Sequence, residues 1–165
     1  MKRFGLAFAV ALSVVTILGL AGPVAAGEQV PFEGRLDGVA AISPVPGGPP
    51  TLVDALVTAE GNATRLGNFA LAIPHRVDRS TLPPSLSGFY YFTAANGDEV
   101  YAEFAGYSMP TEIPNVLAIV ETATITGGTG RFAGATGSFT AYRLFDRVAL
   151  TTTGYFEGTI SSPGD

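Results

Sequence analysis

The chain has 165 residues, of which 47% are hydrophobic, with 21 glycines, 12 prolines, one histidine, no cysteine and a formal net charge of −5. This composition excludes disulfides, cysteine nucleophiles and multi-histidine zinc sites, so the sequence predicts no metal and no cofactor. An acidic chain also lacks the clustered cations that nucleic acids require, and we therefore expect no nucleic-acid partner.

The N-terminus predicts export from the cytoplasm. Lys2 and Arg3 precede an uncharged apolar run from Phe4 to Leu20, and Val24-Ala25-Ala26 supplies small residues for a signal peptidase. This order is typical of a secretory signal peptide, so we expect residues 1–26 to be cleaved and the protein to be secreted or periplasmic. The alternative is an uncleaved anchor, because the apolar run approaches the roughly 17 residues that can cross a bilayer. After cleavage no membrane span is expected.

The remaining residues, 27–165, are predicted to form one domain. Their basic residues are seven arginines, which stand against 14 acidic residues and give a formal net charge of −7. Because an exported domain without disulfides is commoner in bacteria than in animals, this composition favours a bacterial source.

The pattern of apolar residues indicates an all-β domain. Short apolar runs alternate with turn signals, and no sustained helical period occurs. The expected strands are 30–42, 52–60, 66–73, 88–95, 99–106, 116–126, 135–146 and 151–160. Such a series favours an antiparallel eight-stranded up-and-down β-barrel, which leaves no exposed sheet edge. A two-sheet sandwich is the alternative.

Three short segments are expected to be tight connections, namely Gly61-Asn62, Asn96-Gly97 and Gly127–Gly130. Residues 43–50 and 75–85 are expected to be surface loops. Pro74 precedes the second loop, and proline cannot donate a hydrogen bond to a β-ladder. His75 is therefore predicted to be an exposed loop residue.

The segment around the last of these connections carries a family resemblance. It reads Gly127-Gly-Thr-Gly-Arg-Phe-Ala-Gly-Ala-Thr-Gly137. This segment resembles the Gly-Gly-(Ser/Thr)-Gly-x-Phe-x-x-x-x-Gly hairpin of the allene oxide cyclase and dirigent barrels and of related small secreted bacterial proteins. The resemblance implies an eight-stranded antiparallel barrel with an apolar cavity, commonly assembled as a homo-oligomer. In the plant families, cyclases close an epoxide ring and dirigent proteins orient phenoxy radicals for coupling.

The alternation of side chains along the strands suggests where a ligand would bind. Glu121 and Arg143 are each the only charge in an otherwise apolar period-two row, on two strands that the glycine-rich connection would pair. We expect both side chains to point into the barrel and form its polar centre, although a purely structural ion pair is the alternative. Tyr91 and Tyr101 are further candidates for lining the cavity, since tyrosine hydroxyls are common polar handles for small ligands.

Two classes of function are compatible with these features. The first is noncatalytic binding of an apolar small molecule, or another noncatalytic role outside the cytoplasm. The second is a cofactor-free cyclase or coupling guide of the kind that the resemblance implies. The first class is favoured because Thr136, before the last glycine of the motif, stands where dirigent proteins typically carry arginine and cyclases tend to carry an aromatic residue.

Overall fold

The computed structural model describes residues 27–161, so the predicted signal peptide lies outside the described residues. Within this range, no helix is long and apolar enough to cross a membrane. The described chain folds into antiparallel strands with a single 3₁₀ turn, η1, before β8. The elements are β1 (Gln29–Pro31), β2 (Gly34–Pro44), β3 (Leu52–Ala63), β4 (Gly67–Asp78), β5 (Ser85–Ala94), β6 (Glu99–Pro110), β7 (Val116–Gly128), η1 (Gly130–Phe132), β8 (Gly137–Asp146) and β9 (Thr151–Ser161).

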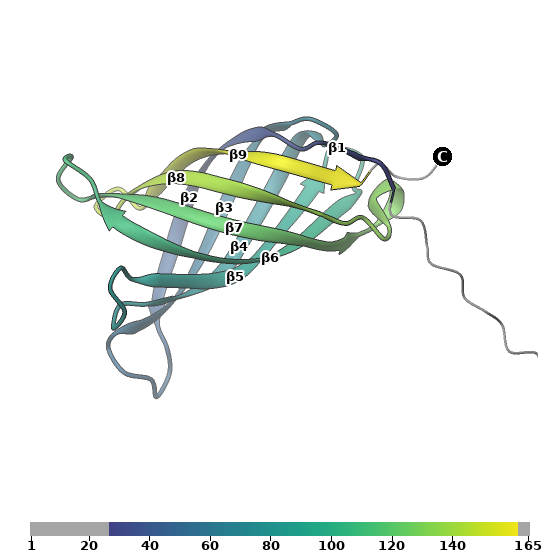
Figure 1. Cartoon of the computed structure of the whole chain (residues 1–165). Helices are drawn as coiled ribbons and strands as arrows, with labels where there is room; N and C mark the ends of the chain where they lie inside the picture. Colours follow the sequence, from purple (N-terminus) through teal and green to yellow (C-terminus); the bar gives the residue numbers. More distant parts are fainter. Residues whose placement is uncertain (1–26, 162–165) are drawn as a thin grey trace, which may run out of the picture.

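The strands β2 to β9 form a closed eight-stranded barrel (Figure 1). Each strand pairs antiparallel with the next along the chain, and β9 pairs with both β8 and β2. The short β1 pairs with the end of β9 beyond β2. The predicted all-β barrel is thus confirmed, and the sandwich alternative is wrong because one continuous sheet closes on itself.

Of the three expected connections, Asn96-Gly97 lies between β5 and β6, whereas Gly127 and Gly128 end β7 and the β7–β8 connection runs from Thr129 through η1 to Thr136. Gly61-Asn62 lies inside β3. The β3–β4 hairpin turns at residues 64–66 instead, where Arg65 adopts a φ of 69°. Gly61 serves close packing between strands, because a Cβ atom there would come within 1.9 Å of the carbonyl oxygen of Arg35 on β2.

The strand β4 continues through Pro74 to Asp78, so the expected loop at 75–85 shrinks to the residues between β4 and β5. Pro74 is tolerated because the β4–β5 ladder skips Ile73 and Pro74 between its Ala72–Tyr91 and His75–Gly88 pairs. A residue without an N–H group loses no ladder bond at such a gap. His75 therefore belongs to a strand and not to a loop.

The two ends of the barrel are packed differently. The end that carries β1 and η1 is filled by phenylalanine rings, whose centroids lie 5.0 to 6.2 Å apart. Figure 1 shows η1 at this end, where its Phe132 side chain is buried. We call this end the aromatic half, defined by Phe32, Phe69, Phe92, Phe139 and Phe156. At the other end the inward positions carry smaller side chains and leave the lumen open.

Candidate functional site

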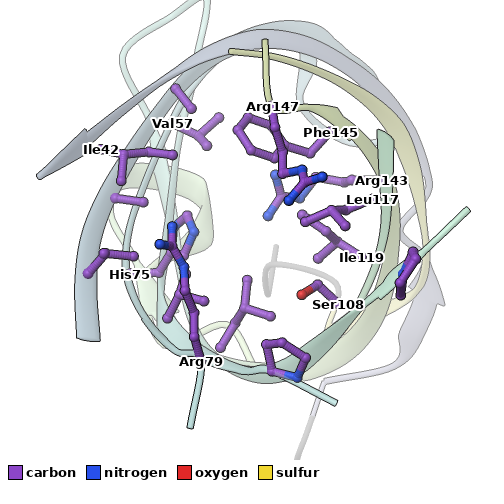
Figure 2. A pocket seen from close by; sticks show the side chains of 17 residues that line it. Ile42, Val57, His75, Arg79, Ser108, Leu117, Ile119, Arg143, Phe145 and Arg147 are labelled. Atoms are coloured by element: carbon purple, nitrogen blue, oxygen red, sulfur yellow. The ribbon is translucent and has the colours of Figure 1, made fainter. Parts of the chain in front are cut away.

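The open half of the barrel contains a cavity of about 490 Å³ (Figure 2). Its walls come from strands β2 to β8 and from the loops that follow β4 and β8. Most of the lining is aliphatic or aromatic. The lining residues are Ala40, Ile42, Val53, Ala55, Val57, His75, Val77, Arg79, Pro84, Leu86, Ser108, Pro110, Leu117, Ile119, Arg143, Phe145 and Arg147. A largely apolar cavity of this size is typical of a small-molecule site.

A buried ion pair between Glu121 and Arg143 closes the inner end of the cavity. Arg143 donates from Nη2 to Oε1 of Glu121 at 2.6 Å and from Nε to Oε2 at 2.9 Å, with both side chains at most 1% exposed. Tyr90 donates its hydroxyl to the same Oε2 at 2.5 Å. Both charged side chains point into the barrel, as the alternation predicts, while their contact with a ligand stays a prediction.

The surroundings of the ion pair hold its side chains in place and shift the pKa values of Tyr90 and Arg143. Burial, and next the charge of Glu121, raise the pKa of the Tyr90 hydroxyl well above 10.0, so this group remains a donor. Burial lowers the pKa of Arg143, but Glu121 and Tyr90 together more than offset this effect and the net shift is upward. Arg143 also donates from Nη1 to Oγ1 of Thr152 at 3.3 Å. This bidentate pair therefore acts as a rigid polar floor.

Glycines on neighbouring strands make room for the inward polar side chains. Glu121 stands in register with Gly106 and Arg143 with Gly154. A Cβ atom on Gly106 would lie 2.8 Å from Cγ of Glu121, and one on Gly154 would lie 2.9 Å from Cγ of Arg143. Each long side chain thus lies over a glycine, which has no side chain. Small residues beside large ones allow a narrow barrel to accommodate the large ones.

His75 is the functional candidate that sequence reasoning placed wrongly. Its ring lines the cavity, and Nδ1 lies 2.9 Å from the carbonyl oxygen of Ile73 (Figure 2). A carbonyl only accepts hydrogen bonds, so Nδ1 carries the proton of the neutral ring and Nε2 is left as an acceptor. Burial lowers the pKa of His75 below 6.5 and favours this neutral form. The signal that could have found it is Gly88, which stands in register with His75 as the other glycines do with their partners.

Tyr91 and Tyr101 lie on the outer face of the barrel, so the expectation that they line its interior is wrong. Tyr91 is 41% exposed, and its ring stacks edge-on against that of Tyr101 at 5.8 Å. The Tyr101 hydroxyl donates to Glu99. On β5 the buried side chains include Tyr90 and Phe92. Because side chains alternate between the two faces of a strand, the odd-numbered residues of β5 point outward. The interior tyrosine is therefore Tyr90.

Two arginines that sequence reasoning did not single out stand at the open mouth of the cavity. Arg79 follows β4 and Arg147 follows β8, and Figure 2 shows both side chains reaching into the lumen from different sides of the rim. The lining contains no carboxylate. In the part of the chain that the structure describes, no group of three histidine, cysteine or acidic side chains is placed to hold a metal ion.

The barrel is similar to solved structures of dirigent proteins. The pterocarpan synthase dirigent protein PsPTS1 superposes with a TM-score of 0.60 at 11% identity, over 84% of this chain and 97% of that one. The pterocarpan synthase dirigent protein GePTS1 superposes with a TM-score of 0.55 at 13% identity, over 94% of this chain and 100% of GePTS1. No family model and no curated protein matches the sequence. The fold expected from the glycine-rich motif is thus confirmed as a dirigent-like barrel.

Proposed function

We propose that this protein binds an apolar small molecule in the open half of its barrel and does so without catalysing a reaction. The observation that carries the proposal is the cavity of about 490 Å³ with its mostly apolar lining. Desolvating an apolar ligand and its walls supplies the binding free energy, in proportion to the apolar area that both lose to water. A barrel already open at one end needs no rearrangement to admit such a ligand.

The arrangement of the inner polar groups supports a noncatalytic role. The Glu121 carboxylate accepts hydrogen bonds from Arg143 and Tyr90, and Arg143 is held in turn by Glu121 and Thr152. Groups that satisfy one another in this way stabilise the wall of a site. They are not free to move a proton to or from a ligand.

Filling the cavity tests this proposal. The fluorescent probe is phenylnaphthylamine, an uncharged aromatic molecule whose emission rises in apolar sites. Ala40→Phe should abolish its binding, because Ala40 lines the cavity. Ala41→Phe is the matched control, since the adjacent residue faces outward on the same strand. Equal binding by the two variants would refute the proposed site.

A second candidate function is the guidance of a reacting ligand without a cofactor. The two dirigent proteins with this fold are described as pterocarpan synthases. The observation in its favour is the free acceptor Nε2 of His75 in the cavity wall, which could orient a hydroxyl group or accept a proton. If the protein only binds, His75→Gln should change probe affinity without changing the products formed from any bound reactant.

We also propose that the protein acts outside the cytoplasm. This proposal rests on Lys2, Arg3 and the Val24-Ala25-Ala26 site in the sequence. N-terminal sequencing of the protein recovered from its native host should begin at Gly27. Recovery of Met1 would show an uncleaved anchor instead.

A further inference from the structure

The charges at the cavity mouth point to the chemical class of the ligand. We infer that the cavity takes an apolar molecule with a single anionic group, which lies at the mouth between Arg79 and Arg147 while the apolar body points inward. This inference rests on the proposed function, because it requires the cavity to bind small molecules. It adds the sign of the ligand's charge and the direction in which the ligand enters.

The two arginines at the mouth take part in no ion pair of the described residues. The described residues form three ion pairs, which join Arg76 to Asp54, Arg131 to Asp98 and Arg143 to Glu121. Arg79 and Arg147 take part in none of these pairs. The side chain of Arg147 makes only a long contact, 3.5 Å from Nη2 to the side-chain oxygen of Asn115. Arg79 and Arg147 stay outside ion pairs although residues 27–165 carry twice as many acidic as basic side chains.

The acidic residues closest in sequence to these arginines are directed elsewhere. Asp78 accepts hydrogen bonds from the backbone and hydroxyl groups of Ser80, at 2.8 and 2.6 Å. Asp146 accepts from the backbone of Val148 at 2.7 Å and of Ala149 at 2.9 Å. Both carboxylates shape the turns after β4 and β8, and neither lines the cavity. The charged side chains that line the mouth itself are therefore the two arginines.

The inner end of the cavity offers no comparable attraction for an anion. The guanidinium of Arg143 is already held by both oxygens of Glu121. Burial lowers the pKa of His75 from 6.5 and so favours its neutral form at pH 7. An anionic group placed at this end would lose its hydration without gaining a free cation, whereas at the mouth it keeps contact with both water and the two arginines. The charged group of the ligand consequently points outward.

A pair of probes with the same apolar body tests this inference. Anilinonaphthalene sulfonate carries one negative charge, and phenylnaphthylamine lacks only the sulfonate group. The double variant Arg79→Gln/Arg147→Gln should bind the sulfonate about tenfold more weakly and the neutral probe within about twofold of the parent. Added salt should weaken sulfonate binding to the parent and have little effect on the double variant.

Two controls separate the possible outcomes. The variant Arg35→Gln/Arg65→Gln removes the same charge from exposed positions at the aromatic end, and it should leave both affinities unchanged. Ala40→Phe should abolish binding of both probes, which assigns the signal to the cavity. Equal loss of sulfonate affinity in the two arginine variants would overturn the inference while the proposed function stands. If the parent binds neither probe, both the inference and the proposed function fail.

Discussion

The aromatic half and the open half of the barrel share the same eight strands but differ in the volume of their inward side chains. Phenylalanines from β4, β5, β8 and β9 meet Phe32 at one end and leave no lumen. At the other end the inward positions include the small residues Ala40, Ala55 and Ser108, and about 490 Å³ stays open. An eight-stranded barrel is just wide enough for side chains to fill it, so residue size alone decides whether it holds a ligand.

The largest effect that separates the halves should come from removing a ring in the aromatic half. Phe92 is fully buried and packs against Phe32, Phe69 and Phe139. Phe92→Ala should lower the free energy of unfolding by about 4 kcal/mol, through lost burial and the void left behind. Leu117→Ala, in the cavity wall, should cost less than half as much because its side chain already faces open space. Urea unfolding measures both, and equal losses would show that the open half is packed as tightly as the other.

The next effect concerns the floor between the halves. Glu121→Gln should lower the free energy of unfolding by about 3 kcal/mol, because it leaves the charge of Arg143 buried without a counter-charge. The double variant Glu121→Leu/Arg143→Met should recover most of this loss if the pair serves structure only.

An exposed ion pair is the control for this experiment. Asp54 and Arg76 lie 2.9 Å apart on the outer face, with side chains 42% and 52% exposed. Asp54→Asn should leave the unfolding midpoint unchanged, since water screens such pairs. If the unfolding midpoint of Glu121→Gln is as high as that of Asp54→Asn, water reaches the ion pair between Glu121 and Arg143.

A smaller effect is expected at the glycines of the β7–β8 connection. Gly130 and Gly137 have φ angles of 54° and 146°, which side chains with a branched Cβ disfavour. Gly130→Val or Gly137→Val should each destabilise the protein by roughly 1 kcal/mol or more. Ala133→Val, at an exposed position with a φ of −56°, is the matched control. Unchanged thermal stability in both glycine variants would contradict a structural role for the motif.

The smallest effect is a pH dependence at the cavity wall. Burial, with a further contribution from the charge of Arg143, lowers the pKa of His75 from 6.5 in the folded state, although the hydrogen bond to Ile73 and the charge of Glu121 oppose the shift. Below pH 6.5 the unfolded chain then binds more protons than the folded protein. The free energy of unfolding is therefore highest above this pH and decreases as the pH falls below it. His75→Gln should flatten the stability profile between that pH and about 5, above the range where carboxylates titrate. An unchanged slope in the variant would contradict a buried neutral histidine.

The fold and the inner ion pair could be predicted because each depends on local pattern. Turn residues between alternating runs indicate an antiparallel series, and a lone charge such as Glu121 or Arg143 marks an inward row when all its neighbours are apolar. Tyr91 and Tyr101 were misplaced because both faces of the β5–β6 hairpin are rich in apolar residues. A shift of one residue exchanges such faces, and only packing in three dimensions decides between them.

The mouth of the cavity could not be predicted from the sequence. Proline usually ends a strand. Pro74 is tolerated inside β4 because of a gap in the β4–β5 ladder, and this gap is visible only once the strands are paired. Arg79 and Arg147 lie far apart in the chain and after different strands. The two arginines lie at one opening only because the barrel closes. The sequence pattern around either residue does not indicate this closure.

Closure by β9 has a consequence for the order in which the protein can fold. Every pairing among β2 to β8 joins consecutive strands, and these contacts form at low entropic cost. The pairing of β9 with β2 instead joins the two extremes of the described chain. Until β9 is in place, β2 and β8 both present unpaired edges, and a chain still emerging from a ribosome cannot yet protect them. We therefore expect the pairing of β9 to complete folding, and we expect the protein to be most prone to aggregation before this strand has paired.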